Sequence, residues 1–325
     1  MLVSIAQQGV RAVRRARNRL LNLIDPPVVV LIYHRVTKLP ADPQLLAVTP
    51  ENFRAHLQYL KRNHNLVRFE DDWSNTEIPA VAITFDDGYA DNAVEALPII
   101  EEEGVPVTFF ITTGTVGTRQ EFWWDELERI ILGELAFPAR FTLDDSRFGQ
   151  VWPTGTVAER QTLYREIHPL MKKVDAGCRA NWLMQLRHWA DAGEEGRETN
   201  RAMSLEELCR LADSTWVTIG AHTVTHTPLS SLSAAEQREE IIGSRRHLEN
   251  WLGQEIRVFS YPFGAKRDYT RDSVALCREA GFVKVAANVP GQAHRWTDPY
   301  RIPRQLVRNW DEATFARHLE SFLVL

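Results

Sequence analysis

The sequence predicts a parallel α/β fold. Apolar, β-branched runs alternate with segments of helical spacing along most of the 325 residues, and this alternation is typical of a parallel sheet covered by helices. Side chains that can bind a metal or transfer a proton follow directly after several of these runs. The carboxyl ends of parallel strands meet at one edge of a sheet, so we expect these side chains to converge there.

The first half of the chain supplies three expected strands. An apolar run at 28–36 predicts the first strand, and a helix capped by Thr49 follows it. Residues 80–85 predict a second buried strand, and 105–112 predict a third. Between these two strands, the helical spacing ends at Gly104, because glycine commonly follows the last turn of a helix.

The second half begins with an expected insertion. The segments within 119–202 are rich in tryptophan, polar and weakly periodic, and we expect them to form a mostly helical insertion. Strands are expected again at 216–222, 258–264 and 283–289, with a long helix capped by Ser233 after the first of them. An amphipathic helix closes the chain.

Composition narrows the possible functions. The net charge of -5 and the pI of about 6.1 give no general reason to bind nucleic acid, so we expect no such partner. Cys178, Cys209 and Cys277 are scattered and share no CxxC spacing, which argues against a disulfide framework and fits a reducing compartment. No stretch approaches the apolar length that a membrane span requires.

Residues 1–26 are expected to form a basic amphipathic helix before a domain that covers 27–325. Arginines interrupt the apolar residues of this segment, so it lacks the unbroken apolar run of a secretory signal, and Pro26 and Pro27 end it. Two interpretations remain open: the helix packs on the domain, or it lies on an anionic membrane surface. The expected location is cytoplasmic, in the second case at the periphery of the inner membrane.

Two adjacent carboxylates, Asp86 and Asp87, end the strand predicted at 80–85. Neighbouring side chains of a strand point to opposite faces, so both can reach one site only if the chain turns, and Gly88 supplies that freedom. Two ionised carboxylates this close repel each other, and a bound cation would relieve the repulsion. The alternative is a plain turn with a solvated face.

His222 ends the strand predicted at 216–222, and His226 follows four residues later. Their spacing lets both imidazoles point the same way on a helical turn, although two histidines four residues apart also arise by chance. Together with Asp87, they would form a three-ligand site that leaves positions open for water and substrate, as catalysis requires. Histidine and carboxylate ligands suit a divalent ion such as zinc.

Three motifs together resemble the polysaccharide deacetylase family, also called the NodB-homology family or carbohydrate esterase family 4. They are VAITFDDGYADN, GAHTVTHTPL and FSYPFG. The resemblance implies a distorted (β/α) barrel of about seven strands, with its site at the C-terminal mouth. It also implies that Asp86 is the catalytic base and that Asp87, His222 and His226 bind the metal.

The sequence departs from the usual family pattern in two places. Ser260 stands where the third motif usually has an arginine, and the late Leu-x-His of the family is absent. The sequence is closer to a subgroup of exopolysaccharide and biofilm deacetylases with a Y-P-[FY]-G motif and an N-terminal Tyr-His strand end. That resemblance makes His34 the candidate acid, and Arg301 or Arg304 the candidate replacement for the lost arginine.

Further residues are expected to contact the substrate. A backbone N–H near Tyr89 would stabilise the oxyanion, and Pro262 and Phe263 belong to the third motif. Trp123 and Trp124 either form a platform for the sugar or pack in the core of the insertion.

The expected function is metal-dependent removal of the N-acetyl group from an amino sugar, in the biosynthesis of cell-surface polysaccharide or lipopolysaccharide. The expected partner is therefore an N-acetylated sugar or glycan. A deformylase and a chitooligosaccharide deacetylase on the same scaffold are the nearest alternatives. A catalytically inactive glycan-binding protein is the alternative from another class.

Overall fold

The computed structural model describes residues 21–134 and 137–324. Most of the helix expected over residues 1–26 therefore lies outside the described residues, and residues 21–24 are helical. No helix in the described part of the chain has the length and apolarity needed to cross a membrane.

The strands and helices follow one another in close alternation. The strands are β1 (Val28–Tyr33), β2 (Arg35–Val36), β3 (Ala47–Val48), β4 (Asn65–Leu66), β5 (Ala80–Phe85), β6 (Val107–Ile111), β7 (Arg140–Thr142), β8 (Val151–Pro153), β9 (Val217–Ala221), β10 (Val258–Ser260), β11 (Lys284–Ala286) and β12 (Gln305–Leu306). The α-helices are α2 (Pro50–Asn63), α3 (Leu97–Glu103), α4 (Trp123–Leu132), α5 (Val157–Met171), α6 (Ala176–Ala190), α7 (Leu205–Ala212), α8 (Ala234–Leu252), α9 (Arg271–Glu279) and α10 (Glu312–Val324). A π-helical turn covers Asn92–Ala96, and short 3₁₀ turns cover Glu198–Asn200 and Leu229–Ser231.

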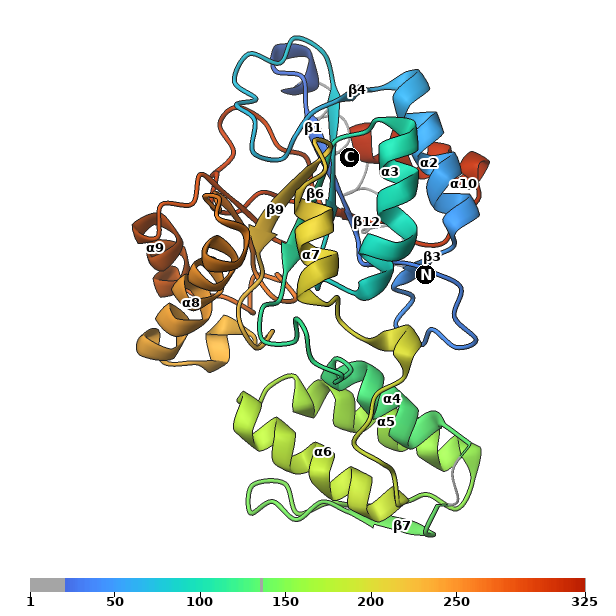
Figure 1. Cartoon of the computed structure of the whole chain (residues 1–325). Coiled ribbons are helices and arrows are strands. Elements are labelled where there is room, and N and C mark those ends of the chain that lie inside the picture. Colours follow the sequence, from blue (N-terminus) through green and yellow to red (C-terminus); the bar gives the residue numbers. More distant parts are fainter. Residues whose placement is uncertain (1–20, 135–136, 325) are drawn as a thin grey trace, which may run out of the picture.

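The main sheet is parallel and strongly curled, as Figure 1 shows. Its strands follow the order β11-β10-β9-β6-β5-β1-β12, and β4 pairs beside this path with β5. A parallel bridge between Ala286 and Ile302 joins β11, at one edge of the sheet, to the segment that precedes β12, at the other edge. The predicted (β/α) barrel fold of about seven strands is thereby confirmed.

The central strands are buried on both faces, as expected when helices cover a parallel sheet. All six residues of β1 and all six of β5 are buried, and the two strands pair along their whole length. Around the sheet, the helix caps are those that the sequence predicts. Thr49 accepts a hydrogen bond from the Asn52 amide, and Ser233 caps α8 in the same way. Gly104 ends α3 in the left-handed conformation.

Two features of the sheet differ from the expectation. The strand predicted over 28–36 breaks at His34, because Arg35 and Val36 leave the main sheet and pair with β3. The two-residue strand β12 was not predicted, since it is too short to produce an alternating pattern. This strand nevertheless closes one edge of the barrel against β1.

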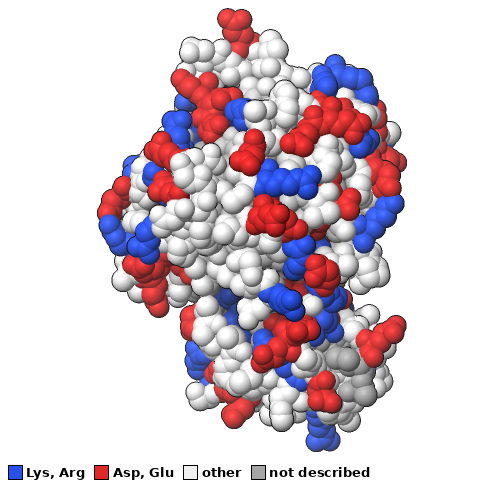
Figure 2. Space-filling model, viewed as in Figure 1, with Lys and Arg blue, Asp and Glu red and all other residues white. Residues whose placement is uncertain are grey.

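The helices α4, α5 and α6 form a separate layer at one end of the barrel (Figure 1). They pack around an apolar core of their own, with Trp182 fully buried. An unpredicted hairpin of β7 and β8 lies beside them. The buried carboxylate of Glu121 ties this layer together, because it binds both Arg129 and Arg197. On the face shown in Figure 2, acidic and basic side chains are interspersed.

Gly220 in β9 shows how closely the barrel is packed. A Cβ atom at this position would lie 2.6 Å from the ring of Phe110 and 2.9 Å from Val258. We expect Gly220→Ala to lower the free energy of unfolding by roughly 1–3 kcal/mol, because the surrounding core cannot yield without strain. Urea denaturation measures this change. Gly149→Ala is the control, since nothing lies within 4 Å of its Cβ position; equal stability of the two variants would contradict the prediction.

Candidate functional site

Asp87, His222 and His226 meet at the carboxyl ends of β5 and β9. The Oδ1 atom of Asp87 lies 3.2 Å from Nε2 of His226 and 3.6 Å from Nε2 of His222. All three side chains are buried, and their candidate ligand atoms lie within 4.8 Å of one another. Three donors of this kind, facing one point, fit a divalent metal ion.

The turn after β5 brings the first of these side chains into place. Asp87 and Gly88 both have positive φ angles, of 78° and 91°. The Asp87 carbonyl accepts a hydrogen bond from the Thr112 amide at the end of β6, which holds the turn against the neighbouring strand. A non-glycine residue at positive φ is costly, and such strain is found mainly where a site requires it.

The two histidines do not lie on a helical turn, so that part of the sequence interpretation is wrong. Residues 222–226 form a loop in which Thr223 and His226 have positive φ angles of 65° and 53°. The carboxylate of Glu240 accepts hydrogen bonds from the Val224 and Thr225 amides, and the Thr223 hydroxyl accepts one from the His226 amide. This bonding bends the loop so that both imidazoles face Asp87.

The two histidine rings are held by different means. Nδ1 of His222 lies 2.7 Å from the carbonyl of Ser260, so this nitrogen carries the proton, and Nε2 faces the point around which the candidate ligand atoms of Asp87 and His226 also lie. Nδ1 of His226 has no hydrogen-bond partner among the described residues. Its ring is instead packed against Trp124 and Phe263, at centroid distances of 4.7 and 4.8 Å.

Asp86 is held by a buried ion pair. Arg304 donates two parallel hydrogen bonds to the Asp86 carboxylate, each 2.7 Å long, and the Ser260 hydroxyl donates another of 3.3 Å. Burial by itself would raise the pKa of Asp86. The charge of Arg304 and its hydrogen bonds outweigh burial and hold this pKa below its ordinary value. Asp86 is therefore an ionised carboxylate with a fixed orientation.

Of the two arginines considered as replacements for the missing motif arginine, Arg304 contacts Asp86. It lies directly before β12 and is fully buried. Its Nη2 atom also donates to the Ser260 hydroxyl, at 2.8 Å. Arg301 is half-exposed and pairs with Asp298 instead. The Arg304 guanidinium thus reaches Asp86 from the segment before β12, and the small side chain of Ser260 in β10 leaves room for it.

Asp87 is also ionised. Burial would raise its pKa, but the adjacent rings of His222 and His226 hold the pKa well below the usual range. The pKa of His226 is lowered, because its ring is buried away from water. A neutral imidazole and an ionised carboxylate are the protonation states that metal ligation requires.

His34 lies at the end of β1, in the break between the main sheet and β2. Its main-chain carbonyl accepts a hydrogen bond from Asn92, and its Nδ1 atom is buried with no partner among the described residues. Burial lowers the pKa of His34, and the nearby charges of Asp87 and Asp86 partly offset this. The side chain lines the same pocket as the metal-ligand candidates.

This pocket, which we call the metal pocket, has a volume of about 300 Å³. Trp124 and Phe263, two of the residues expected from the sequence to contact the substrate, form part of its wall. Its other lining residues include several that the sequence did not single out: Gln44, Leu46, Lys172, Asp268, Leu306 and Arg308. They come from loops, from the insertion and from β12, and no spacing pattern connects them with the motifs.

Tyr89, Trp123 and Pro262 are not among the lining residues of the metal pocket. The Tyr89 hydroxyl donates to Asp125 and accepts a hydrogen bond from the Trp124 indole, so this side chain holds Trp124 in place. Trp123 packs on His168 within the insertion.

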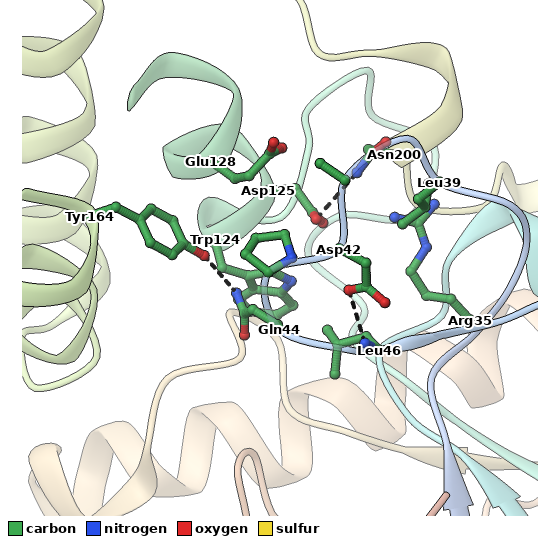
Figure 3. Close-up of a pocket in the computed structure, with 12 residues that line it drawn as sticks. Arg35, Leu39, Asp42, Gln44, Leu46, Trp124, Asp125, Glu128, Tyr164 and Asn200 are labelled. Atoms are coloured by element: carbon green, nitrogen blue, oxygen red, sulfur yellow. Dashed lines mark hydrogen bonds between the residues drawn. The ribbon is translucent and has the colours of Figure 1, made fainter. Parts of the chain in front are cut away.

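A much smaller cavity, drawn in Figure 3, shares the lining residues Gln44, Leu46 and Trp124 with the metal pocket. Its volume of about 20 Å³ is too small for a sugar. Gln44 of the 37–46 loop points across it to the Tyr164 hydroxyl of α5, at 3.5 Å (Figure 3). Buried Arg35 pairs with Asp91 and lies over the Tyr89 ring. Burial raises the pKa of Asp125 to about 7. This cavity is a polar junction between barrel and insertion.

Comparisons with known proteins give the family of this chain. The family described as polysaccharide deacetylase matches residues 74–133 and 142–285. YxkH of Bacillus subtilis (strain 168), named as a polysaccharide deacetylase, is 20% identical over 302 residues, which cover 90% of this chain and 76% of that protein.

Solved structures are similar in fold. A deacetylase of Streptococcus pyogenes, PplD in complex with acetate, has a TM-score of 0.59 at 16% identity, covering 90% of this chain and 98% of that one. IcaB of Ammonifex degensii has a TM-score of 0.58 at 19% identity, covering 93% and 98%. With the family matched over more than half of its length, the chain belongs to the polysaccharide deacetylase family and is a hydrolase of the amide bond of N-acetyl groups.

Proposed function

We propose that this protein is a metal-dependent N-deacetylase of an amino sugar, acting in the biosynthesis of cell-surface polysaccharide or lipopolysaccharide. The observation that carries the proposal is the buried cluster of Asp87, His222 and His226, which opens onto the metal pocket beside Asp86. A site with three protein ligands and an open side suits catalysis rather than a structural role. Zinc suits this ligand set.

In this proposal Asp87, His222 and His226 hold the metal. A divalent ion bound there would lower the pKa of its water and polarise the acetamido carbonyl. Asp86 takes the proton from the attacking water as general base. Arg304 keeps Asp86 ionised and fixes both of its oxygens, so that the carboxylate needs no reorganisation when the proton arrives.

His34 is the proposed general acid. An amine cannot leave as its anion near neutral pH, so a donor must protonate the nitrogen as the amide bond breaks. His34 lines the metal pocket at the end of β1, the strand next to β5. The backbone N–H of Tyr89 is the proposed partner of the oxyanion. The products are acetate and a free amino sugar.

A deformylase or a chitooligosaccharide deacetylase would use the same machinery. The choice among them depends on the walls of the pocket rather than on the ligands. Acetate release from N-acetylated sugars, measured against formate release from N-formylated ones, tests the proposed reaction directly.

The metal ligands and the base are separable by substitution. We expect His226→Ala to lose most of its metal and all hydrolysis, because two protein ligands hold a divalent ion poorly. Asp86→Asn should keep its metal yet lose activity by roughly 10²–10⁴-fold, as for loss of a general base. Elemental analysis and acetate release measure both quantities. Full metal occupancy in His226→Ala, or a metal-free Asp86→Asn, would refute these assignments.

Arg304 should control the acid limb of the pH profile. Arg304→Lys removes the two parallel hydrogen bonds, so the pKa of Asp86 should rise toward its ordinary value. Since the base must be ionised, activity is lost as pH falls through that pKa. The acid limb of kcat/KM should therefore move to higher pH. Arg301→Lys is the matched control and should leave the limb in place; an unmoved limb in Arg304→Lys would contradict the role.

His34 should control the basic limb. Its protonated form is the active one, so activity falls as pH rises through its pKa, which burial places below the ordinary histidine value. We expect His34→Ala to retain its metal, to lose roughly 10²–10⁴-fold in kcat and to lose this limb. His294→Ala is the control, because His294 is held at Asp25. Normal turnover by His34→Ala would exclude His34 as the acid.

A further inference from the structure

A second hollow, larger than the metal pocket, opens between the insertion and the barrel. Its volume is about 570 Å³. The insertion contributes the residues that end and follow α5, and the barrel contributes the segment around Leu229–Ser231 and the loop after β10. We call it the basic groove, and its charged lining residues are Lys172, Lys173, Arg267 and Asp268.

The basic groove carries an excess of positive charge. Lys172 is paired with Asp268 at 3.0 Å, and Asp268 is the one carboxylate among the described residues that line the groove. Lys173 and Arg267 are exposed and form no ion pair within residues 21–134 and 137–324. The side chains of Ser230 and Ser231 also line the groove. The groove therefore presents two uncompensated cations and hydroxyl groups, which suit an anionic oxygen ligand.

The basic groove lies next to the metal pocket. Lys172 and Asp268 line both hollows. The Lys172 ammonium lies over the ring of Phe263, 4.1 Å from its centroid, and that ring packs on the metal-ligand candidate His226. A group bound in the groove would thus be attached to the sugar whose acetamido group lies at the metal site, or to the next residue of the glycan.

The neighbouring parts of the chain carry negative charge. Residues 175–177, which follow the groove residue Lys173, and residues between 225 and 240 line another hollow of about 450 Å³, whose lining includes Asp175, Glu236, Glu239 and Glu240. Like charges repel, so a long polyanion that followed the basic groove would meet these carboxylates. The arrangement suits one anionic group and not a run of them.

We propose that the basic groove binds a single anionic group of the substrate, either a phosphoryl group or a carboxylate, next to the N-acetylated sugar. This inference rests on the proposed deacetylase function and narrows its substrate class to anionic amino-sugar compounds. The phosphoryl group would come from a sugar linked to a nucleotide or a lipid, and the carboxylate from a uronic acid residue. Lys173 and Arg267 are specificity residues, and they take no part in the chemical step.

The test compares two double variants with the same change of charge. Lys173→Gln/Arg267→Gln removes the two unpaired cations of the groove. Lys61→Gln/Arg317→Gln removes one lysine and one arginine from α2 and α10, which pack together away from the groove. The substrates are UDP-N-acetylglucosamine, a disaccharide of N-acetylglucosamine and glucuronic acid, and neutral chitobiose.

The groove variant should raise KM for one or both anionic substrates by roughly two- to tenfold at low salt, as for loss of exposed charge contacts. Its kcat, and its KM for chitobiose, should match those of the control variant. The difference should shrink at high salt, where charges are screened. Equal KM values for all three substrates in the two variants, or hydrolysis of chitobiose alone by the unaltered protein, would overturn the proposal.

Binding of pyrophosphate to the metal-loaded proteins, measured by calorimetry, separates this inference from the proposed function. Any contact of pyrophosphate with the metal is common to both double variants, so a weaker affinity of the groove variant reports the groove. Equal affinities would overturn the proposal. If the unaltered protein hydrolysed none of the substrates, the deacetylase function would fail, and the pyrophosphate comparison would still decide whether the groove binds anions.

Discussion

Asp86 and Asp87 lie side by side at the buried end of β5, and the burial of two ionised carboxylates constrains the rest of the site. Removing such charges from water costs several kcal/mol each unless partners compensate for it. Asp87 is compensated by two histidines from the loop after β9, and Asp86 by Arg304 from the chain segment before β12. The barrel is what makes this possible, because it brings strand ends from distant parts of the chain to one mouth. The same partners hold both carboxylates in their ionised form, which the proposed metal ligand Asp87 and the proposed base Asp86 both require.

The predictable part of the fold is the part with a repeating pattern. The strands β1, β5 and β6 and the caps at Thr49 and Ser233 follow from apolar runs and helix-start residues. The two-residue strand β12 carries no such pattern, and the β7–β8 hairpin alternates exposed and buried residues over only three positions per strand. The loop at 222–226 was misread as a helical turn because i, i+4 spacing is not specific to helices. Its shape depends on Glu240 of α8, which no local pattern reveals.

The residues of the candidate site likewise fall into two groups: those that sequence motifs identify, and those that only the tertiary packing brings to the pocket. Asp86, Asp87, His222, His226 and His34 all stand next to predicted strands, and the barrel brings their side chains to one pocket. Arg304 could be named beside Arg301 but not preferred to it. The choice depends on which of the two side chains the segment before β12 directs into the barrel. Lys172, Arg308 and Gln44 could not be named at all. They belong to loops and to the insertion, whose packing on the barrel is a tertiary property.

The insertion does more than cover the site. It supplies Trp124, which packs on His226 where no hydrogen bond orients that ring, and Tyr89 and Asp125 hold the indole in turn. It also supplies Lys172, which lies over Phe263, the second ring that packs on the same histidine. The His226 imidazole is therefore positioned by side chains that also line the metal pocket and, through Lys172, the basic groove. Changes to the insertion that alter the walls of the metal pocket would consequently also disturb the candidate metal ligand His226, and this coupling restricts how freely the walls can vary.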